Sequence, residues 1–329
     1  MASGLAEGRL LNQFSMHEYD NRLFVATTQG SPWGPQADSE SFVTSLEVSG
    51  DSLVEVGKVG NMGRGERIFA VRFVDDTAYV VTFRQVDPFY VVDLSNPASL
   101  VVTGELKIPG FSSYLHPITD TLILGVGQDA DERGQLLGAK VSLFDVSDPT
   151  NPVERSVWTI PDSGSSVEWD HRAFLYWAPE NLAVLPINQY GPDPFIGAIA
   201  LRVTEAGISE VARIDHEVAS NDGEPFSTCR PVDASEFFGP DAIVEVCGPD
   251  DETFRPGFYC ETIFDVEGFG LEVELADGEY LQFCFPDFGA LPAPIERTLV
   301  IGDSLWSMSY DFLQSNDLQS FVQTDREPF

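Results

Sequence analysis

Four histidines and one arginine carry the strongest chemical signal in this sequence. His17, Arg72 and His116 each lie six residues before a matching residue of a recurring hairpin, so they hold equivalent positions in consecutive repeats. His171 and His216 lie near the two ends of the next repeat. Neutral imidazoles that converge on one axis are what Zn²⁺ or a similar divalent ion requires. The sequence therefore predicts a divalent metal site, for zinc or a similar ion or for Ca²⁺, with His17, His116, His171 and His216 as ligands.

Charged residues beside these histidines supply candidate catalytic groups. Glu18 and Asp170 each adjoin a histidine, where a carboxylate can bind the metal, orient a ligand or act as a general base. Arg72 can stabilise an oxyanion or a phosphoryl group, or it can pair with a structural carboxylate. A bound metal would lower the pKa of water and polarise a carbonyl or phosphoryl oxygen. The alternative for each histidine is a channel-lining or core residue that binds no metal.

The elements that must position these residues are short strands of a repeated unit. The clearest copy runs from Gly65 to Pro117, with strands expected at Phe69–Val74, Ala78–Phe83, Pro88–Leu94 and Leu100–Ile108. The matching hairpin residues Leu23, Ala78, Leu122 and Leu182 are 55, 44 and 60 residues apart. Such a period, with four short strands in each unit, is typical of a β-propeller. We count five units, which predicts an all-β chain of about five four-stranded blades.

An acidic block that contains all four cysteines interrupts the repeats. We assign residues 1–216 to four blades, residues 217–294 to this insertion and residues 295–329 to the last blade. The cysteines are 18, 13 and 24 residues apart without a C-x-x-C motif, which argues against a zinc site. An even number within one insertion favours two disulfides and an oxidising compartment, and we expect Cys229–Cys247 and Cys260–Cys284. Four reduced, buried cysteines are the alternative.

Net charge limits the partners. The chain has 18 basic and 53 acidic residues, a formal net charge of −35, which disfavours nucleic acids and anionic membranes. No apolar run is long enough to span a membrane. We expect a monomer that meets a small-molecule substrate or an extracellular partner. Two short motifs carry no function: Gly302–Leu305 spells an esterase motif within a hairpin turn, and Asp129–Gly134 resembles a calcium loop that lacks its ligands.

Several sequence segments of the chain resemble those of a known family. The segments GERIFAVRFVDDTAYVVTFRQVDPFYVVDLSNP, IPGFSSYLHP, VSLFDVSDP and WDHRAFLYW are similar to secreted bacterial and archaeal proteins with a C-terminal β-propeller domain, which is distantly related to WD40 propellers. The similarity covers roughly residues 11–216 and 295–322 and leaves the cysteine block outside. It implies a β-propeller in a secreted protein, and it implies no reaction, substrate or catalytic residue.

Two functions are therefore predicted from the sequence. The first is metal-dependent hydrolysis of an ester, a lactone or a phosphotriester at the mouth of the channel. The second is a non-catalytic extracellular binding propeller that presents an acidic face to a partner or to cations. The matching positions of His17, Arg72 and His116 favour the first function slightly.

Overall fold

The structure, a computed structural model, describes residues 2–31, 38–83, 87–131, 133–190, 194–216, 227–232, 243–247, 260–263, 280–286 and 292–329. These residues form 25 β-strands and four short 3-10 turns, which confirms the all-β prediction. They divide into a larger unit, Met1–His216 with Pro294–Phe329, and a smaller unit, Glu217–Ala293. Among them, no helix is long and apolar enough to cross a membrane.

The second sheet of the larger unit matches its sequence prediction to within two residues at each boundary. It has the strand order β5–β6–β7–β8, with strands at Arg67–Val74 (β5), Thr77–Phe83 (β6), Asp87–Asp93 (β7) and Val101–Ile108 (β8). β6 is rich in β-branched and aromatic residues and is buried along most of its length, as suits an inner strand. Asp75 adopts φ 47° in the tight turn between β5 and β6, a conformation that Asp tolerates better than most residues.

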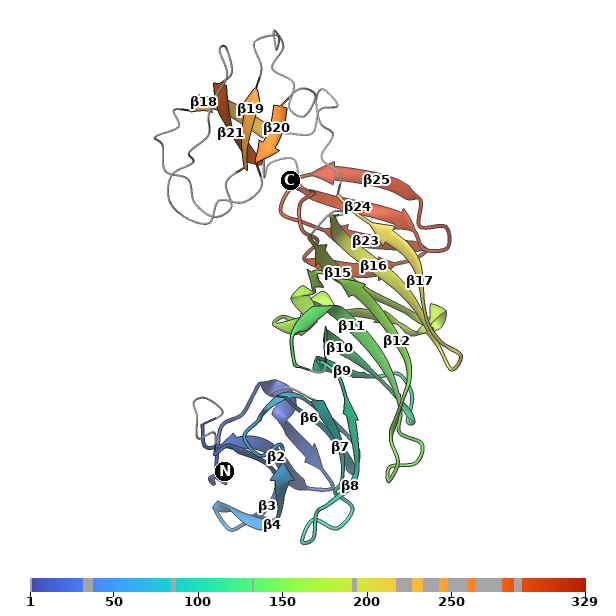
Figure 1. The fold of residues 1–329 in the computed structure, drawn as a ribbon. Helices are drawn as coiled ribbons and strands as arrows, with labels where there is room; N and C mark the ends of the chain where they lie inside the picture. Colours follow the sequence, from blue (N-terminus) through green and yellow to red (C-terminus); the bar gives the residue numbers. More distant parts are fainter. Residues whose placement is uncertain are drawn as a thin grey trace. The chain divides into compact units, whose positions relative to one another are not determined.

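The first and third sheets repeat this antiparallel order (Figure 1). The first consists of Met16–Tyr19 (β1), Arg22–Gln29 (β2), Glu40–Ser49 (β3) and Ser52–Met62 (β4), and a 3-10 turn, Gln13–Ser15 (η1), precedes it. The third consists of Phe111–Pro117 (β9), Leu122–Ala130 (β10), Leu136–Asp145 (β11) and Val153–Pro161 (β12).

In the fourth sheet, the first strand is split into two pieces that pair with opposite ends of the same neighbour. Its strands are Ser163–Gly164 (β13), Leu175–Trp177 (β14), Leu182–Gln189 (β15), Phe195–Thr204 (β16) and Gly207–Ile214 (β17). Two 3-10 turns, Ser166–Glu168 (η2) and His171–Ala173 (η3), separate β13 from β14, and a third, Ala178–Glu180 (η4), follows β14. The segment between β13 and β14 therefore leaves the β-ladder, and η2 and η3 lie outside it.

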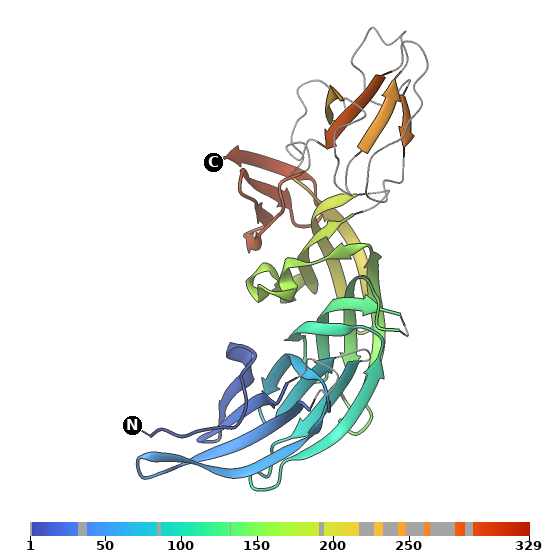
Figure 2. The ribbon, with the colours of Figure 1, turned by 60° about the vertical axis from the view of Figure 1, so that its left-hand side comes forward.

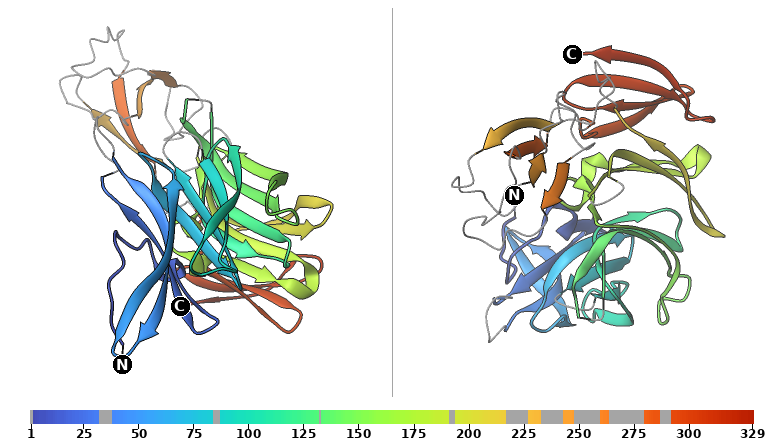
Figure 3. Two further views of the ribbon diagram at one scale, coloured as in Figure 1. Left: turned by 90° about the horizontal axis from the view of Figure 1, so that it is seen from below. Right: turned by 45° about the horizontal axis from the view of Figure 1, so that its top comes forward.

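The fifth sheet follows the smaller unit in the chain and returns to the larger one. Its strands are Arg297–Ile301 (β22), Ser304–Met308 (β23), Phe312–Asp317 (β24) and Gln323–Pro328 (β25). Gly302, at φ 60°, forms the β22–β23 turn, so the esterase-like motif lies in a hairpin turn as predicted. β14 and β15 contact β22, and Figure 3 shows the red fifth sheet beside the yellow-green fourth sheet.

Four buried apolar clusters join the five sheets in chain order. One cluster links the first sheet to the second sheet, through residues such as Phe24 and Val80. Another links the second sheet to the third sheet, through Phe89 and Phe144. The next two link the third sheet to the fourth and the fourth to the fifth, where Leu182 packs with Leu305. Each sheet therefore buries an apolar face against at least one neighbouring sheet, and Figure 2 shows this succession.

Outer strands also approach the turns of the next sheet closely. Gly57 on β4 and Gly104 on β8 lie at matching bulges, and a Cβ at either position would lie 2.3 Å from a carbonyl oxygen, that of Pro97 or Pro149. These turns are the Asn-Pro and Asp-Pro turns of the second and third sheets. Only glycine permits this approach without displacing the neighbouring backbone.

The smaller unit contains one antiparallel sheet of order β18–β21–β19–β20, coloured orange in Figure 1. Its strands are Ser227–Val232 (β18), Ile243–Cys247 (β19), Cys260–Ile263 (β20) and Tyr280–Pro286 (β21). The backbone register sets Cys229 opposite Cys284 and Cys247 opposite Cys260. The pairs expected from the sequence, Cys229–Cys247 and Cys260–Cys284, are therefore not the pairs that face each other across these ladders.

Candidate functional site

The register places His17, Arg72 and His116 at matching positions of the first strands of three consecutive sheets. His17 pairs with Phe24, Arg72 with Tyr79, and His116 with Leu124. All three lie one or two residues before their strand ends at the first hairpin. They therefore lie near the ends of these strands, beside the turn to the second strand of each sheet.

Arg72 links the second sheet to the third. Its Nε donates to the carbonyl oxygen of Leu115 at 2.9 Å, and its guanidinium carbon lies 4.0 Å from the ring centroid of Phe14 and 5.4 Å from that of Tyr114. Burial lowers the pKa of the Arg72 guanidinium, which still leaves an arginine charged at neutral pH. This geometry makes Arg72 a half-buried cation stabilised by aromatic faces.

Tyr114 and His116 form a polar pair within the same region. The Tyr114 hydroxyl lies 3.2 Å from Nδ1 of His116, and the Phe174 and Tyr176 rings have centroids 5.2 and 5.3 Å from the imidazole. Desolvation, assisted by the charge of Arg72, lowers the pKa of His116 to about 4. His116 is therefore neutral at physiological pH, so one of its ring nitrogens can accept a hydrogen bond or bind a metal.

His171 completes an aromatic cluster around Tyr114. Its Nε2 lies 3.1 Å from the side-chain amide nitrogen of Gln13, and its ring meets Phe14 edge-on at 4.8 Å. The Tyr114 ring lies 6.1 Å from it in a near-parallel orientation. The sequence spacing did not predict that the segment before β1 would supply Gln13 and Phe14.

His17 and Glu18 lie on the first sheet, apart from this cluster. The His17 ring stacks on Phe73 with centroids 5.3 Å apart, and its Nε2 lies 3.0 Å from the carbonyl oxygen of Asp75. Glu18 is exposed on β1, and its carboxylate has no hydrogen bond or ion pair within the described residues. His17 thus bridges the first sheet to the second through backbone and aromatic contacts.

Asp170 is held by two arginines. It caps η3 through the backbone of Arg172, bonds the Arg172 side chain at 2.8 Å and accepts from Nη2 of Arg297 at 2.6 Å. The hydrogen bond from Arg172 is the main cause that holds the pKa of Asp170 well below its usual range. A carboxylate so stabilised is a poor proton acceptor, so this geometry suits a positioning role better than a general base.

His216 is completely buried between the fourth and fifth sheets. Its Nδ1 lies 2.8 Å from Oγ of Ser309, and its Nε2 lies 2.8 Å from Oγ of Ser307. Desolvation, followed by the charge of Arg326, lowers the pKa of His216 to about 4. Both ring nitrogens are engaged, so a metal at this histidine would have to displace a serine hydroxyl.

The predicted metal ligands do not form one cluster within the described part of the chain. There, no group of three or more His, Cys, Asp or Glu side chains is close enough to hold a metal ion. The structure brings both His116 and His171 into contact with Tyr114 and leaves His17 and His216 in separate contacts. The residues present therefore do not fit the predicted site of four histidine ligands.

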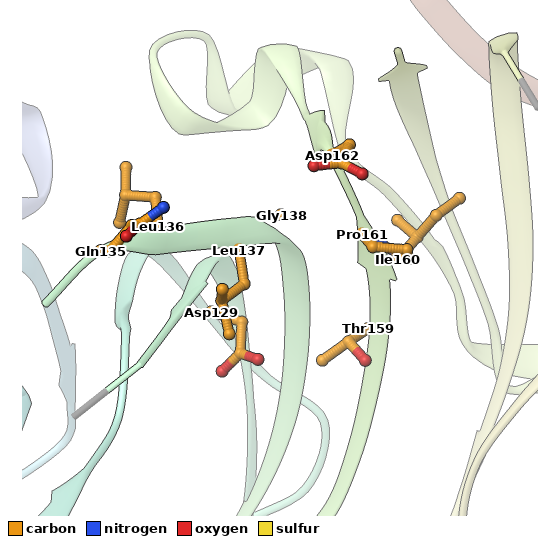
Figure 4. Close-up of a pocket in the computed structure, with 9 residues that line it drawn as sticks. All are labelled: Asp129, Gln135, Leu136, Leu137, Gly138, Thr159, Ile160, Pro161 and Asp162. Atoms are coloured by element: carbon orange, nitrogen blue, oxygen red, sulfur yellow. The ribbon is translucent and has the colours of Figure 1, made fainter. Parts of the chain in front are cut away.

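A pocket of about 370 Å³ lies at the opposite end of the third sheet from His116 (Figure 4). The end of β10, the start of β11 and the end of β12 form its walls. The lining residues are Asp129, Gln135, Leu136, Leu137, Gly138, Thr159, Ile160, Pro161 and Asp162. Leu136 and Leu137 are 50% and 44% exposed, which leaves apolar surface open to a ligand.

Two carboxylates give this pocket its electrostatic character. The Asp129 carboxylate lies 3.9 Å from Nζ of Lys140, which is buried. Lys140 forms a closer ion pair with Glu154, at 3.1 Å, and donates a hydrogen bond to the carbonyl oxygen of Pro109. Asp162 is exposed at φ 51° after β12. The sequence signal for this pocket is the acidic Asp129–Gly134 segment, which resembles a calcium loop without its ligands and for which no function was predicted.

Comparison with known proteins agrees with this architecture. A family model described as a beta propeller domain matches residues 1–234. The chain belongs to the beta propeller domain family. Uncharacterized proteins from Archaeoglobus fulgidus and Methanocaldococcus jannaschii are 46% and 42% identical to it over 184 residues. Each match covers 56% of this chain, and the chain spans only 27% or 28% of the length of these relatives.

Two solved structures are more distantly similar to this beta propeller. Sqt1 from Chaetomium thermophilum has a TM-score of 0.41 and 13% identity, with 94% of this chain and 69% of that chain covered. Apo AztD from Citrobacter koseri also has a TM-score of 0.41, with 11% identity and coverage of 95% and 60%.

Proposed function

We propose that this beta propeller is a binding protein that holds a basic partner, such as an arginine or lysine side chain, in the acidic pocket of Figure 4. The observation that carries the proposal is the combination of two carboxylates, Asp129 and Asp162, with the exposed apolar surface of Leu136 and Leu137 in one pocket. A basic side chain has the same two parts, an apolar stem and a cationic head.

The charge balance near the pocket supports a cationic ligand. Lys140 is the basic group closest to Asp129, and its main partners are Glu154 and a backbone carbonyl, so it only partly compensates the pocket carboxylates. The net charge of −35 adds an attractive field for cations over the whole surface. Such a field raises the association rate of a basic partner and repels anionic competitors.

The pocket also has a suitable size. Its volume of about 370 Å³ lies at the lower end of the roughly 300–1,000 Å³ that small-ligand pockets occupy. One long side chain of a partner fills such a space, with its stem against Leu136 and Leu137. A bound guanidinium can then form charge-assisted hydrogen bonds with a carboxylate.

The partner is proposed to be extracellular. This part of the proposal rests on the acidic composition and on the four cysteines, which favour an oxidising compartment. Detection of the protein in the medium or cell envelope of its source organism, by fractionation and immunoblotting, tests the location separately from binding.

Metal-dependent hydrolysis of an ester, lactone or phosphotriester is the competing proposal. The described residues do not gather the ligands that it needs, which is why binding is preferred. Elemental analysis of protein purified without chelator distinguishes the two. About one equivalent of a transition metal, lost together with ester hydrolysis in His116→Ala, would favour the hydrolase over the binding protein.

Calorimetric titration with N-acetyl-arginine methylamide tests the binding proposal directly. The citrulline analogue, which has the same shape and no charge, is the matched ligand control. We expect the parent protein to bind the arginine compound at low salt. The affinity should be at least about tenfold weaker in the D129N/D162N double variant, because each lost charge-assisted hydrogen bond contributes more than about 1 kcal/mol.

Asp120→Asn is the matched protein control, because it removes the same charge from the exposed β9–β10 turn at the other end of the same sheet. Its affinity should equal that of the parent protein. Equal affinity for the arginine and citrulline compounds, or unchanged affinity in D129N/D162N, would overturn the proposal.

A further inference from the structure

A second pocket, of about 230 Å³, lies between the fourth and fifth sheets of the propeller and shares no residue with the acidic pocket. It is formed by η2 and the residues after it, by the end of β15 and by the segment that leads into β22. The lining residues are Ser166, Trp169, Asp170, Pro186, Asn188, Pro294, Ile295, Glu296 and Arg297.

Trp169 leaves a large aromatic surface in solvent at this pocket. Its side chain is 75% exposed, although tryptophan is on average a highly buried residue. An aromatic ring kept in water beside a concave polar site is typical of ligand recognition. The hydrogen bonds of η2 and the Asp170 cap of η3 hold the backbone on both sides of Trp169.

The polar groups of the pocket present both donors and acceptors in fixed positions. Arg297 donates from Nη2 to Asp170 at 2.6 Å and from Nη1 to the carbonyl oxygen of Glu296 at 2.6 Å. Oγ of Ser166 is buried and has no hydrogen-bond partner within the described residues. A buried hydroxyl without a partner is costly, so a ligand that bonds it gains stability.

The balance of charge in the pocket argues for a neutral ligand. Arg297 and Arg172 both pair with Asp170, and the carboxylate of Glu296, which also lines the pocket, forms a hydrogen bond with Tyr310. Two cations therefore balance two carboxylates here, and each charged group has a partner within the protein. The strongly acidic surface disfavours anions. A neutral ligand with several hydroxyl groups and one apolar face matches both the mixed polar groups and the indole.

We infer that this pocket, named here the Trp169 pocket, binds one ring of a saccharide. The C–H face of the sugar lies on the Trp169 indole, and its hydroxyl groups bond Ser166, Asn188 and the Asp170–Arg297 pair. The volume is below the roughly 300–1,000 Å³ of pockets that enclose drug-sized ligands, which suits a single ring at the end of a glycan. The inference does not depend on the acidic pocket, because the two share no residue.

Saturation-transfer NMR with the methyl glycosides of glucose, galactose, mannose and N-acetylglucosamine tests this inference. We expect transfer to the ring protons of at least one glycoside, with an affinity at least about tenfold weaker in Trp169→Ala, because exposed aromatic anchors carry much of a binding energy. Ser166→Ala should weaken the same ligand.

Phe329→Ala is the matched control, since this aromatic residue is also 75% exposed and lies at the end of the fifth sheet outside the pocket. It should leave saccharide binding unchanged. D129N/D162N should also leave it unchanged, which separates this result from the proposed function. Absence of transfer to all four glycosides at millimolar concentration, or equal binding in Trp169→Ala, would overturn the inference.

Discussion

Tyr114 and His116 lie two residues apart on β9, and the Tyr114 hydroxyl is 3.2 Å from Nδ1 of the imidazole. Arg72 donates a hydrogen bond to the oxygen of the same Tyr114 hydroxyl. Because this oxygen accepts from Arg72, its own proton is directed towards His116. Because neutral His116 then accepts at Nδ1, its own proton lies on Nε2. Nε2 has no partner within the described residues and is not a buried atom.

Replacement of Tyr114 by Phe should remove this tautomer preference. Long-range ¹H–¹⁵N correlation spectra at pH 7 should show His116 protonated on Nε2 in the parent protein and a mixture of tautomers in the variant. Tyr176→Phe is the control, because it removes a hydroxyl from a ring that contacts His116 while that hydroxyl lies near Asn181. The same tautomer ratio in parent and Tyr114→Phe would contradict the assignment.

His216 should make the propeller less stable in acid. Its folded pKa of about 4 lies below the usual 6.5, so between these values the unfolded chain binds more protons than the folded one. The stability that neutral His216 contributes is complete above about pH 6.5 and is lost as the pH falls towards 4, by about 2–3 kcal/mol.

Urea unfolding between pH 7 and 4 measures this effect, with His216→Gln as the comparison. The variant should be less stable at pH 7, because Ser307 and Ser309 lose their shared partner, and it should show a shallower loss of stability in acid. Equal slopes in the two proteins would show that His216 does not carry the effect.

The close approach at Gly104 should make this position intolerant of any side chain. A Cβ there would lie 2.3 Å from the carbonyl oxygen of Pro149, so Gly104→Ala must separate the second sheet from the third. We expect a loss of about 2–4 kcal/mol in unfolding free energy. Gly302→Asn is the control, since no atom lies near its Cβ and Asn tolerates its φ of 60°, and it should cost less than about 1 kcal/mol.

The smaller unit should contain disulfides between Cys229 and Cys284 and between Cys247 and Cys260. These residues are directly opposite each other across antiparallel strand pairs, where Cα atoms are about 4.5–5.5 Å apart, within the range that a disulfide needs. Peptide mapping of the unreduced protein by mass spectrometry tests this. Linked peptides for Cys229–Cys247 or Cys260–Cys284 would instead support the pairing expected from the sequence.

Local sequence was sufficient to predict the strands of the second sheet. The β-branched and aromatic residues of Ala78–Phe83, and the Asp, Asn and Pro residues of the adjoining turns, act through neighbours along the chain, and β6 follows at Thr77–Phe83. Hairpin spacing likewise identified His17, Arg72 and His116 as equivalent, because each is tied by short-range register to its own first hairpin. Both predictions rest on contacts within a single repeat.

The surroundings of these residues were decided only by the tertiary structure. Ser307 lies 91 positions from His216, and Arg297 lies 127 positions from Asp170, so no local pattern predicts that they meet. Gln13 reaches His171 across 158 positions for the same reason. The packing of one sheet on the next sets these distances, and with them it sets the pKa values, the hydrogen-bond partners and the two pockets. The sequence therefore determined which positions of each repeat carry polar residues, and the packing of successive sheets determined which groups those residues contact.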